Sequence, residues 1–541
     1  MPTKPLSPLV LDSVGVFGLN TQANASSLDH RWLIKAENIM LTSEGRLTSR
    51  KGIRAISNSV GNHAVKSLHN HKNTNGTYTL ISSANNKIFK MDFSTSPATS
   101  TQQNFANSPQ TISADNWQWV QYDNNAMAVQ KGHKPIHYNQ TTGVWSDLED
   151  VTGYTSPVGV TTFNPSCVLS KYGRMWAAGI SEDKETLFYS QSLNHHKFQG
   201  TGSGAVNMRS VWGYDDIVAL ESFNGKLIIF GKQNIAIYND PFDPSAATFA
   251  LDEVIHGVGC IARDSVQAFG DDVLFLSADG VRSLNRTKIQ DKMPLTDLTK
   301  NVKSDIIKHI ISSSPDDIKA QFNHSGGYYI LSFTGINETY ILDFKAQNPD
   351  MTPRVTKWLT DFSRSPKSYF STNEGILYIG LGSSVVGKTF NGVVADYDNY
   401  FDVDYSGSTA INNAYQTIFK TVWMDFGNPD TAKLLKQFSC VIDGGREQDV
   451  TVNWFRDYNN TQGDSASFNL RPSSSGVTAL YGSSTSLYGA SKYSPLFFPR
   501  EYRINLSKAA KVVQIEMINL IKGFKGSLQS MTVLAKGGKI R

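Results

Sequence analysis

The sequence predicts an all-β protein: a β-propeller of about seven blades, a C-terminal β-sandwich-like platform domain, and one inserted amphipathic helix. Two observations favour this fold. Short apolar strands recur at a regular interval, and tight-turn dipeptides such as Asn224-Gly225 and Asp279-Gly280 separate them. Such a pattern is typical of antiparallel strands joined by hairpins. Because a pair of hairpin units cannot bury both of its faces, the units are expected to repeat until they close on one another.

Residues 1–57 are expected to form an arm. Glycine and asparagine punctuate its beginning, and the segment ENIMLTSEGRLTSRKGI predicts a hairpin that turns at Ser43-Glu44-Gly45. Gly45 can adopt the positive φ that this turn requires. The sequence leaves two placements open: the arm joins the C-terminal domain, or it supplies a strand that closes the propeller.

Residues 58–405 carry the repeat and are expected to form the propeller. Its central strands begin 46 to 55 residues apart, near Tyr78, Ala126, Arg174, Lys226, Asp272, Gly327 and Ile376. Four-stranded units at about this spacing are typical of propeller blades. An irregular pair of β-sandwiches would also contain many short strands, but it would not explain the regular interval.

One segment has helical periodicity. Between Thr296 and Ser314 the apolar residues follow helical spacing, and Pro315 ends the pattern; these residues are Leu298, Val302, Ile306, Ile307, Ile310 and Ile311. We expect an amphipathic helix on the rim of the propeller. Its role is either packing or contact with a partner.

Residues 406–541 are expected to form the C-terminal β-sandwich-like domain. Strand-like segments such as YQTIFKTVWMDFG, DVTVNWFRD and VVQIEMINL alternate there with turns. The stretch 473–494 is rich in Ser, Gly and Tyr. It is too polar for a core, so an exposed loop is expected.

Composition excludes several classes of protein. At 541 residues the chain should contain two or three domains. Its charge is low, at 18% charged residues and a net +4, which argues against a dedicated nucleic-acid binder with a basic stripe. Cys167, Cys260 and Cys440 are widely spaced, so buried thiols in a reducing cytosol are expected rather than a disulfide. We see neither a signal peptide nor a stretch apolar enough to span a bilayer.

Few residues suggest chemistry. Asp402, Asp404 and Ser406 match the first half of a calcium loop, but the twelfth position is Asn413, where a bidentate Glu is needed. An acidic solvated linker is the alternative. We find no Ser-His-Asp or Cys-His arrangement, predict no catalytic residue, and expect no cofactor.

Several segments resemble the tail hub, or nozzle, proteins of short-tailed bacteriophages. In the arm these are GLNTQ (Gly18 to Gln22), AEN (Ala36 to Asn38) and EGRLTSRKG (Glu44 to Gly52). In the repeats they are GRMWAAG with LFYSQ (173–179 and 187–191), DDIVALESFNGKLIIFGKQNIAIY (215–238) and GVGCIARDSVQAFGDDVLFLSADGVRSL (257–284). The resemblance covers most of residues 15–400 at the level of pattern, and leaves the C-terminal domain unmatched.

The resemblance implies a structural virion protein without enzymatic activity. In that family six copies form a ring or tube below the portal and its adaptor; the tube retains and conducts the genomic DNA and carries fibres, spikes or a plug. It implies assembly in the host bacterial cytoplasm and a propeller on the outside of the ring. Low, balanced charge suits a lumen through which DNA slides, so a neutral or acidic lumen is expected.

The alternative is a carbohydrate-binding or carbohydrate-active propeller. Tryptophans exposed on the blades could stack on sugars, although packing between blades is their commoner use. The candidates are Trp117, Trp119, Trp145, Trp176 and Trp212.

Overall fold

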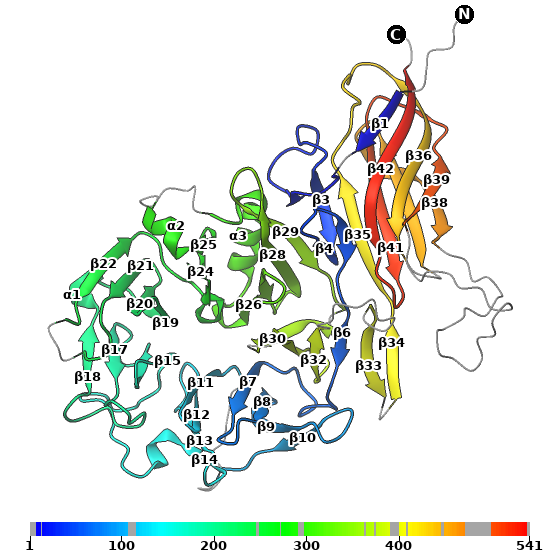
Figure 1. Ribbon diagram of the computed structural model, residues 1–541. Helices are drawn as coiled ribbons and strands as arrows, with labels where there is room; N and C mark the ends of the chain where they lie inside the picture. Colours follow the sequence, from blue (N-terminus) through cyan, green and yellow to red (C-terminus); the bar gives the residue numbers. More distant parts are fainter. Residues whose placement is uncertain are drawn as a thin grey trace, which may run out of the picture.

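The computed structural model contains a β-propeller and an elongated β-rich platform that lie side by side (Figure 1). The structure describes residues 7–11, 13–105, 115–244, 248–270, 272–289, 297–361, 364–372, 375–389, 400–406, 409–444, 448–470 and 499–537. The predicted loop at 473–494 lies outside these residues. The predicted all-β fold, with a propeller, a C-terminal β platform and an inserted helix, is confirmed.

Four successive antiparallel sheets of four strands begin the propeller. The first contains β7 (Ser67–Lys72), β8 (Tyr78–Ala84), β9 (Lys87–Asp92) and β10 (Thr99–Gln102), and the second β11 (Gln118–Tyr122), β12 (Asn125–Val129), β13 (Ile136–Asn139) and β14 (Val144–Asp147). The third contains β15 (Cys167–Lys171), β16 (Arg174–Ala178), β17 (Thr186–Tyr189) and β18 (Gly204–Asn207), and the fourth β19 (Ile217–Phe223), β20 (Lys226–Gly231), β21 (Asn234–Tyr238) and β22 (Leu251–His256).

The remaining sheets close the ring, and the arm supplies the last strand. A three-stranded sheet contains β23 (Gln267–Phe269), β24 (Asp272–Ser277) and β25 (Gly280–Ser283), and the next blade β26 (Ile318–Asn323), β27 (Tyr328–Phe333), β28 (Glu338–Gln347) and β29 (Pro353–Trp358). These six blades use consecutive strands. A further unit, β30 (Pro366–Ser371), β31 (Leu377–Leu381) and β32 (Val386–Thr389), takes its outer strand β6 (Ile53–Ala55) from the arm. The innermost strands, from β7 to β30, then follow one another in a closed circuit, with β30 beside β7.

The platform is hydrogen-bonded directly to one blade. The sheet of β26–β29 continues through β2 (Gly18–Leu19) and β3 (Trp32–Glu37) into the platform strands β35 (Tyr415–Thr421), β41 (Val513–Ile521), β37 (Asp449–Arg456) and β38 (Asn459–Asn469). One ten-stranded sheet therefore runs from the propeller into the platform. The arm serves both of the placements left open by the sequence, since β6 closes the propeller and the other arm strands join the platform.

A second sheet faces it in the platform. Its order is β39 (Pro499–Asn505), β36 (Lys433–Asp443), β42 (Ser527–Gly537), β5 (Leu47–Ser49) and β4 (Ile39–Leu41), with β1 (Ser7–Leu11) on β42 and β40 (Ala509–Ala510) on β36. β4 and β5 form the predicted hairpin, and Gly45 has the expected positive φ of 83°. The hairpin of β33 (Asp402–Ser406) and β34 (Thr409–Asn413) extends the β6 sheet, so the domain boundary expected between 405 and 406 falls within it.

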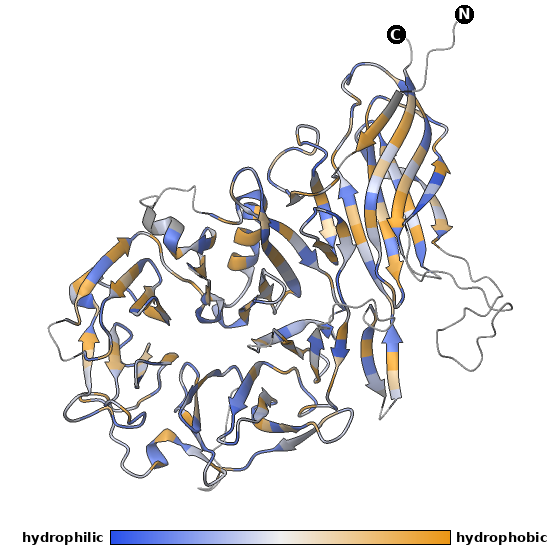
Figure 2. Cartoon of the chain, viewed as in Figure 1, coloured by the Kyte–Doolittle hydropathy of each residue, from blue (hydrophilic) through white to orange (hydrophobic). Residues whose placement is uncertain are grey.

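Hydrophobic side chains fill the spaces between neighbouring blades. Separate clusters lie between most pairs of blades, whereas the largest cluster runs from Leu274 and Phe333 in the propeller to Phe438 and Met531 in the platform. In Figure 2 orange and blue segments alternate along the platform strands, as expected for sheets with one buried face. The two parts of the molecule therefore share a core as well as a sheet.

The inserted helix is shorter than predicted. α3 (Lys303–Ser312) follows a 3₁₀ turn, η4 (Lys300–Val302), and lies against the propeller. Leu298, Val302 and Ile306 are buried, whereas Ile311 is 81% exposed. Two further short helices, α1 (Arg209–Trp212) and α2 (Leu284–Ile289), connect strands. The three cysteines are buried and free, as expected.

Candidate functional site

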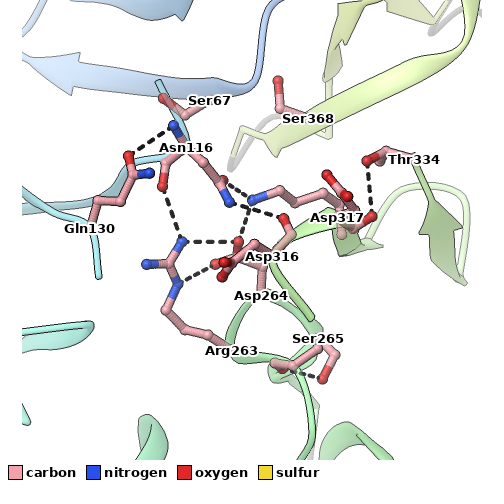
Figure 3. A network of polar contacts seen from close by, with 12 residues as sticks. Ser67, Asn116, Gln130, Arg263, Asp264, Ser265, Asp316, Asp317, Thr334 and Ser368 are labelled. Atoms are coloured by element: carbon pink, nitrogen blue, oxygen red, sulfur yellow. Dashed lines mark hydrogen bonds and ion pairs between the residues drawn. The ribbon is translucent and has the colours of Figure 1, made fainter. Parts of the chain in front are cut away.

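Charged side chains from different blades meet close to the propeller axis (Figure 3). Arg263 and Asp264 belong to a 3₁₀ turn, η2 (Arg263–Ser265), that precedes β23, and Lys319 lies on β26. Asn116 lies just before β11. We call these four residues the axial network. The fold brings them together although Asn116 and Lys319 are 203 residues apart in the sequence.

The network is held by direct hydrogen bonds. Arg263 donates to both carboxylate oxygens of Asp264, at 2.8 and 3.1 Å, and to the carbonyl of Ser166 at 2.9 Å. Lys319 donates to Asp264 Oδ2 and to Asn116 Oδ1. Asn116 donates from Nδ2 to the Asp316 carbonyl at 2.9 Å. One connected set of contacts therefore joins the second, third, fifth and sixth blades.

Burial and charge act in opposite directions on these groups. Burial alone would raise the pKa of Asp264, but Arg263 and Lys319 outweigh it and hold that pKa well below its usual value. Burial lowers the pKa of Lys319, and Asp264 opposes part of this shift. At neutral pH the network thus holds two cations around one ionised carboxylate. Such a set is expensive to desolvate and is strongly destabilised when one partner is removed.

Two cavities adjoin the network, and Arg263 lines both. One, of about 200 Å³, is lined by inner-strand residues such as His69, Trp119 and Gln321. The other, of about 250 Å³, is lined by Lys131, Lys184 and Lys232 among others. Arg263 therefore lines both of these axial cavities. The arrangement suits a set of ion pairs that holds neighbouring blades together, with a cavity large enough for a small ligand beside it.

A second polar cluster lies at the joint between propeller and platform. Arg50 is fully buried and forms a bidentate pair with Asp402, at 2.8 and 2.7 Å. Its Nε donates to Asn38 Oδ1 at 2.9 Å, and the same oxygen accepts from the Leu359 backbone at 2.9 Å. Asn38 Nδ2 donates to the Gln416 carbonyl at 2.8 Å. Asn38 thus connects the arm, the sixth blade and the platform strand β35.

Two glycines of the arm, Gly18 and Gly52, are required by close backbone approach at this joint. A Cβ on Gly18, whose φ is 79°, would lie 2.6 Å from the Val355 carbonyl oxygen. A Cβ on Gly52 would lie 1.8 Å from the Phe401 carbonyl oxygen. Any larger residue would push the arm away from the propeller or from the β33 hairpin.

The residues proposed as a calcium loop form ion pairs instead. Asp402 binds Arg50 and also accepts from the Ile53 backbone at 2.9 Å, while Asp404 binds Arg364. Ser406 is the last residue of β33. Within the described residues no group of three or more His, Cys, Asp or Glu side chains is placed to hold a metal ion. The acidic segment is a paired strand and not a solvated linker.

The tryptophans considered for sugar stacking are not exposed. Trp117, Trp145, Trp176 and Trp212 are 0–9% exposed, and Trp119 is half-buried against His69 with ring centroids 5.7 Å apart. In a propeller both faces of each blade pack on neighbouring blades, so side chains on either face can be buried. Packing between blades explains their positions.

Neither polar cluster was foreseen. The available indications were the adjacent charges of Arg263-Asp264 in the otherwise apolar segment GVGCIARDSVQAF, and Arg50 beside a predicted strand. Their partners lie 55 and 352 residues away, at Lys319 and Asp402. A single sequence does not indicate which charged residues so far apart along the chain will pair in the fold.

No family model and no curated protein matches the chain. A structure of streptogramin B lyase aligns over 63% of this chain and 97% of its own, at 12% identity and a TM-score of 0.36. The β-propeller domain of Cps50 (Swd1) from Myceliophteria thermophila aligns over 62% and 98%, at 12% identity and a TM-score of 0.38. The extracellular domain of the one-component system BT4673 from B. thetaiotaomicron aligns over 91% and 62%, at 10% and 0.40.

Among the described residues, no helix is both long and apolar enough to cross a membrane.

Proposed function

We propose that the chain is a structural subunit of a bacteriophage tail hub or nozzle. Six copies would form a ring in the virion tail, below the portal adaptor, that retains packaged DNA and conducts it during ejection. Fibres, spikes or a plug would attach to this ring. The subunit would act as scaffolding, without catalysis, and would assemble in the cytoplasm of the host bacterium.

The observation that carries the proposal is the position of the arm motifs. GLNTQ contains β2, AEN ends at Asn38, and EGRLTSRKG contains β5, Arg50 and Gly52. These segments form the joint at which one sheet runs from a blade into the platform. The arm segments that resemble the hub family therefore lie where the two parts of this subunit are fixed to each other.

A rigid joint suits a subunit that must hold a tube together. The shared sheet, the common core and the buried Arg50–Asp402 pair resist motion between propeller and platform. Since non-covalent contacts alone would hold such a ring, each subunit contact should bury about 2,000 Å² or more. Heterologous contacts related by rotation would close the ring.

In this proposal the DNA passes through the central hole that the six subunits enclose, and not through the middle of any one propeller. The axial network occupies the middle of the propeller, and Arg263 lines both of the adjoining cavities. The lumen would be enclosed by the six copies and would be neutral or acidic, because a basic wall would retain the phosphates.

Mass photometry of the purified full-length protein over a range of concentrations tests the proposal. We expect a species of six copies that grows with concentration at the expense of the monomer. A protein that stays monomeric at all concentrations, and whose tryptophan fluorescence responds to sugars, would contradict the proposal and favour the carbohydrate-binding alternative.

A further inference from the structure

The larger axial cavity lies where loops of several blades converge at one end of the propeller axis. Its volume is about 250 Å³, and four cationic residues line it. Lys131 follows β12, Lys184 lies between β16 and β17, Lys232 follows β20, and Arg263 begins η2. Four different segments thus direct positive charge to one small space.

The acidic residues of the cavity do not balance this charge. Lys232 Nζ lies 2.7 Å from Asp216 Oδ2, and the pKa of Asp216 is lowered by Lys232 first and then by Lys184 and Lys131. One carboxylate therefore faces three ammonium groups. The other acid in the lining, Asp316, acts on Arg263 and Lys319, whose charges Asp264 also compensates.

The glutamates near Lys184 in the sequence make different contacts: Glu182 accepts from backbone N–H groups, which do not neutralise a carboxylate, whereas Glu185 pairs with a cation. Glu182 accepts from the backbone of Thr161 and Thr162 at 2.9 and 3.2 Å, and Glu185 binds Arg209 at 2.6 Å. With Asp183 they line an adjoining cavity that shares Lys184 and Asp216 with this one. Among the residues that line the axial cavity, four cations face two carboxylates, Asp216 and Asp316, which leaves an excess of two positive charges.

From this arrangement we infer a binding site for a small phosphoanion, with one or two phosphate groups, held by Lys131, Lys184 and Lys232 in the cavity that Arg263 also lines. Ammonium groups bind phosphate oxygens through charge-assisted hydrogen bonds. Because the three lysines are exposed, solvent and salt screen their charges, and binding should be strongest at low salt. Asp216 would compete with the ligand for the same lysines. The site does not depend on the proposed function of the chain.

Isothermal titration of the full-length protein with inorganic pyrophosphate at low salt tests the site. We expect about one pyrophosphate bound per chain, with affinity falling as salt is raised. The double variant Lys131→Gln/Lys184→Gln should bind at least about tenfold more weakly, because two charge-assisted hydrogen bonds are lost. Asp216→Asn should bind more tightly than the wild type, since the competing carboxylate is removed.

The matched control is Lys436→Gln/Lys511→Gln, which removes the same charge from two exposed platform lysines and should leave binding unchanged. A twelve-residue oligothymidylate should not displace pyrophosphate, because the cavity is too small for a nucleic-acid strand. The inference is overturned if wild-type protein binds no pyrophosphate, if the Lys131/Lys184 variant binds it equally well, or if the oligonucleotide displaces it.

Discussion

At the scale of residues, the axial network is the most demanding set of charges in the propeller. Asp264 is the anion between Arg263 and Lys319, and all three are largely withdrawn from solvent. The network stabilises the fold only while it is complete, because an unpaired buried charge costs several kcal/mol. Its contribution should therefore appear when one partner is neutralised.

We expect Asp264→Asn to lower the free energy of unfolding by about 3–5 kcal/mol, because two cations would remain buried without their anion. Chemical denaturation followed by fluorescence measures this. Glu501→Gln is the matched control: it removes a carboxylate from an exposed pair with Arg503, 2.9 Å apart, and should have no measurable effect. Equal effects in the two variants would show that the axial network is not an ionic clasp.

Buried histidines make a second prediction at this scale. His137 and His195 contact each other between the second and third blades, with their Nε2 atoms 3.1 Å apart, so one ring must donate and the other must accept. Burial lowers the pKa of His137 to about 4 and that of His195 to about 3. Burial also lowers the pKa of His69 to about 3.

Stability should therefore fall on acidification. Below the usual histidine pKa of about 6.5, these histidines become protonated in the unfolded chain but stay neutral in the folded protein. This difference destabilises the folded state progressively until the pH reaches the folded pKa values of about 3 to 4. Each such histidine contributes a slope of up to about 1.4 kcal/mol per pH unit. Denaturation at pH 7.5, 6 and 5 should show the loss, and His195→Gln should reduce the slope. His63→Gln, at an exposed site, is the control and should leave the slope unchanged. If His195→Gln also leaves the slope unchanged, the buried histidine pair is not the source of the pH dependence.

At the scale of elements, the joint is built from short strands that depend on buried contacts. β6 has three residues and β33 five, and Asp402 links β33 to Arg50 and Ile53 of the arm. The Arg50 side chain is fully buried and lies over the Tyr415 ring, 4.1 Å from its centroid. The Arg50–Asp402 pair should therefore contribute more to stability than the Arg364–Asp404 pair, whose aspartate lies in the same strand.

Asp402→Asn should destabilise the protein by about 3–5 kcal/mol, because Arg50 would be left charged in a buried site. Asp404→Asn breaks the partly exposed pair with Arg364, in which the Asp404 carboxylate is 31% exposed, and should cost about 1 kcal/mol or less. Thermal and chemical unfolding compare the two. A larger loss for Asp404→Asn would contradict the description of the joint.

The face of α3 that packs on the propeller gives another test. Ile306→Ala should lower the free energy of unfolding by about 2–5 kcal/mol, because Ile306 is fully buried. Ile311→Ala should change it by less than about 0.5 kcal/mol, since this side chain is 81% exposed. Similar losses in the two variants would mean that the helix packs through another face.

Local patterns were enough to predict the blades, because strand alternation and turn residues are read within a few positions. The second strands β8, β12, β16, β20, β24, β27 and β31 begin at or within one residue of the predicted positions. The predicted helix began at Thr296, whereas α3 begins at Lys303. Leu298 matched the helical spacing because it is buried, although it lies before the helix. The closing role of β6, the Arg50–Asp402 pair and the axial network depend on contacts between distant segments, which local patterns do not contain.

At the scale of the whole molecule, the propeller and the platform form one body. They share the ten-stranded sheet and the largest hydrophobic cluster, and the arm crosses between them. A ring assembled from such subunits would transmit force through hydrogen-bonded strands and not through a flexible linker. This property links the fold to the tail hub proposal.

Electron microscopy of the purified full-length protein in negative stain tests that proposal most directly. The account predicts rings of six subunits around a central hole, each with propeller and platform in the relation seen in Figure 1. Particles that remain single subunits at every concentration, or rings in which the two parts take varying orientations, would contradict it.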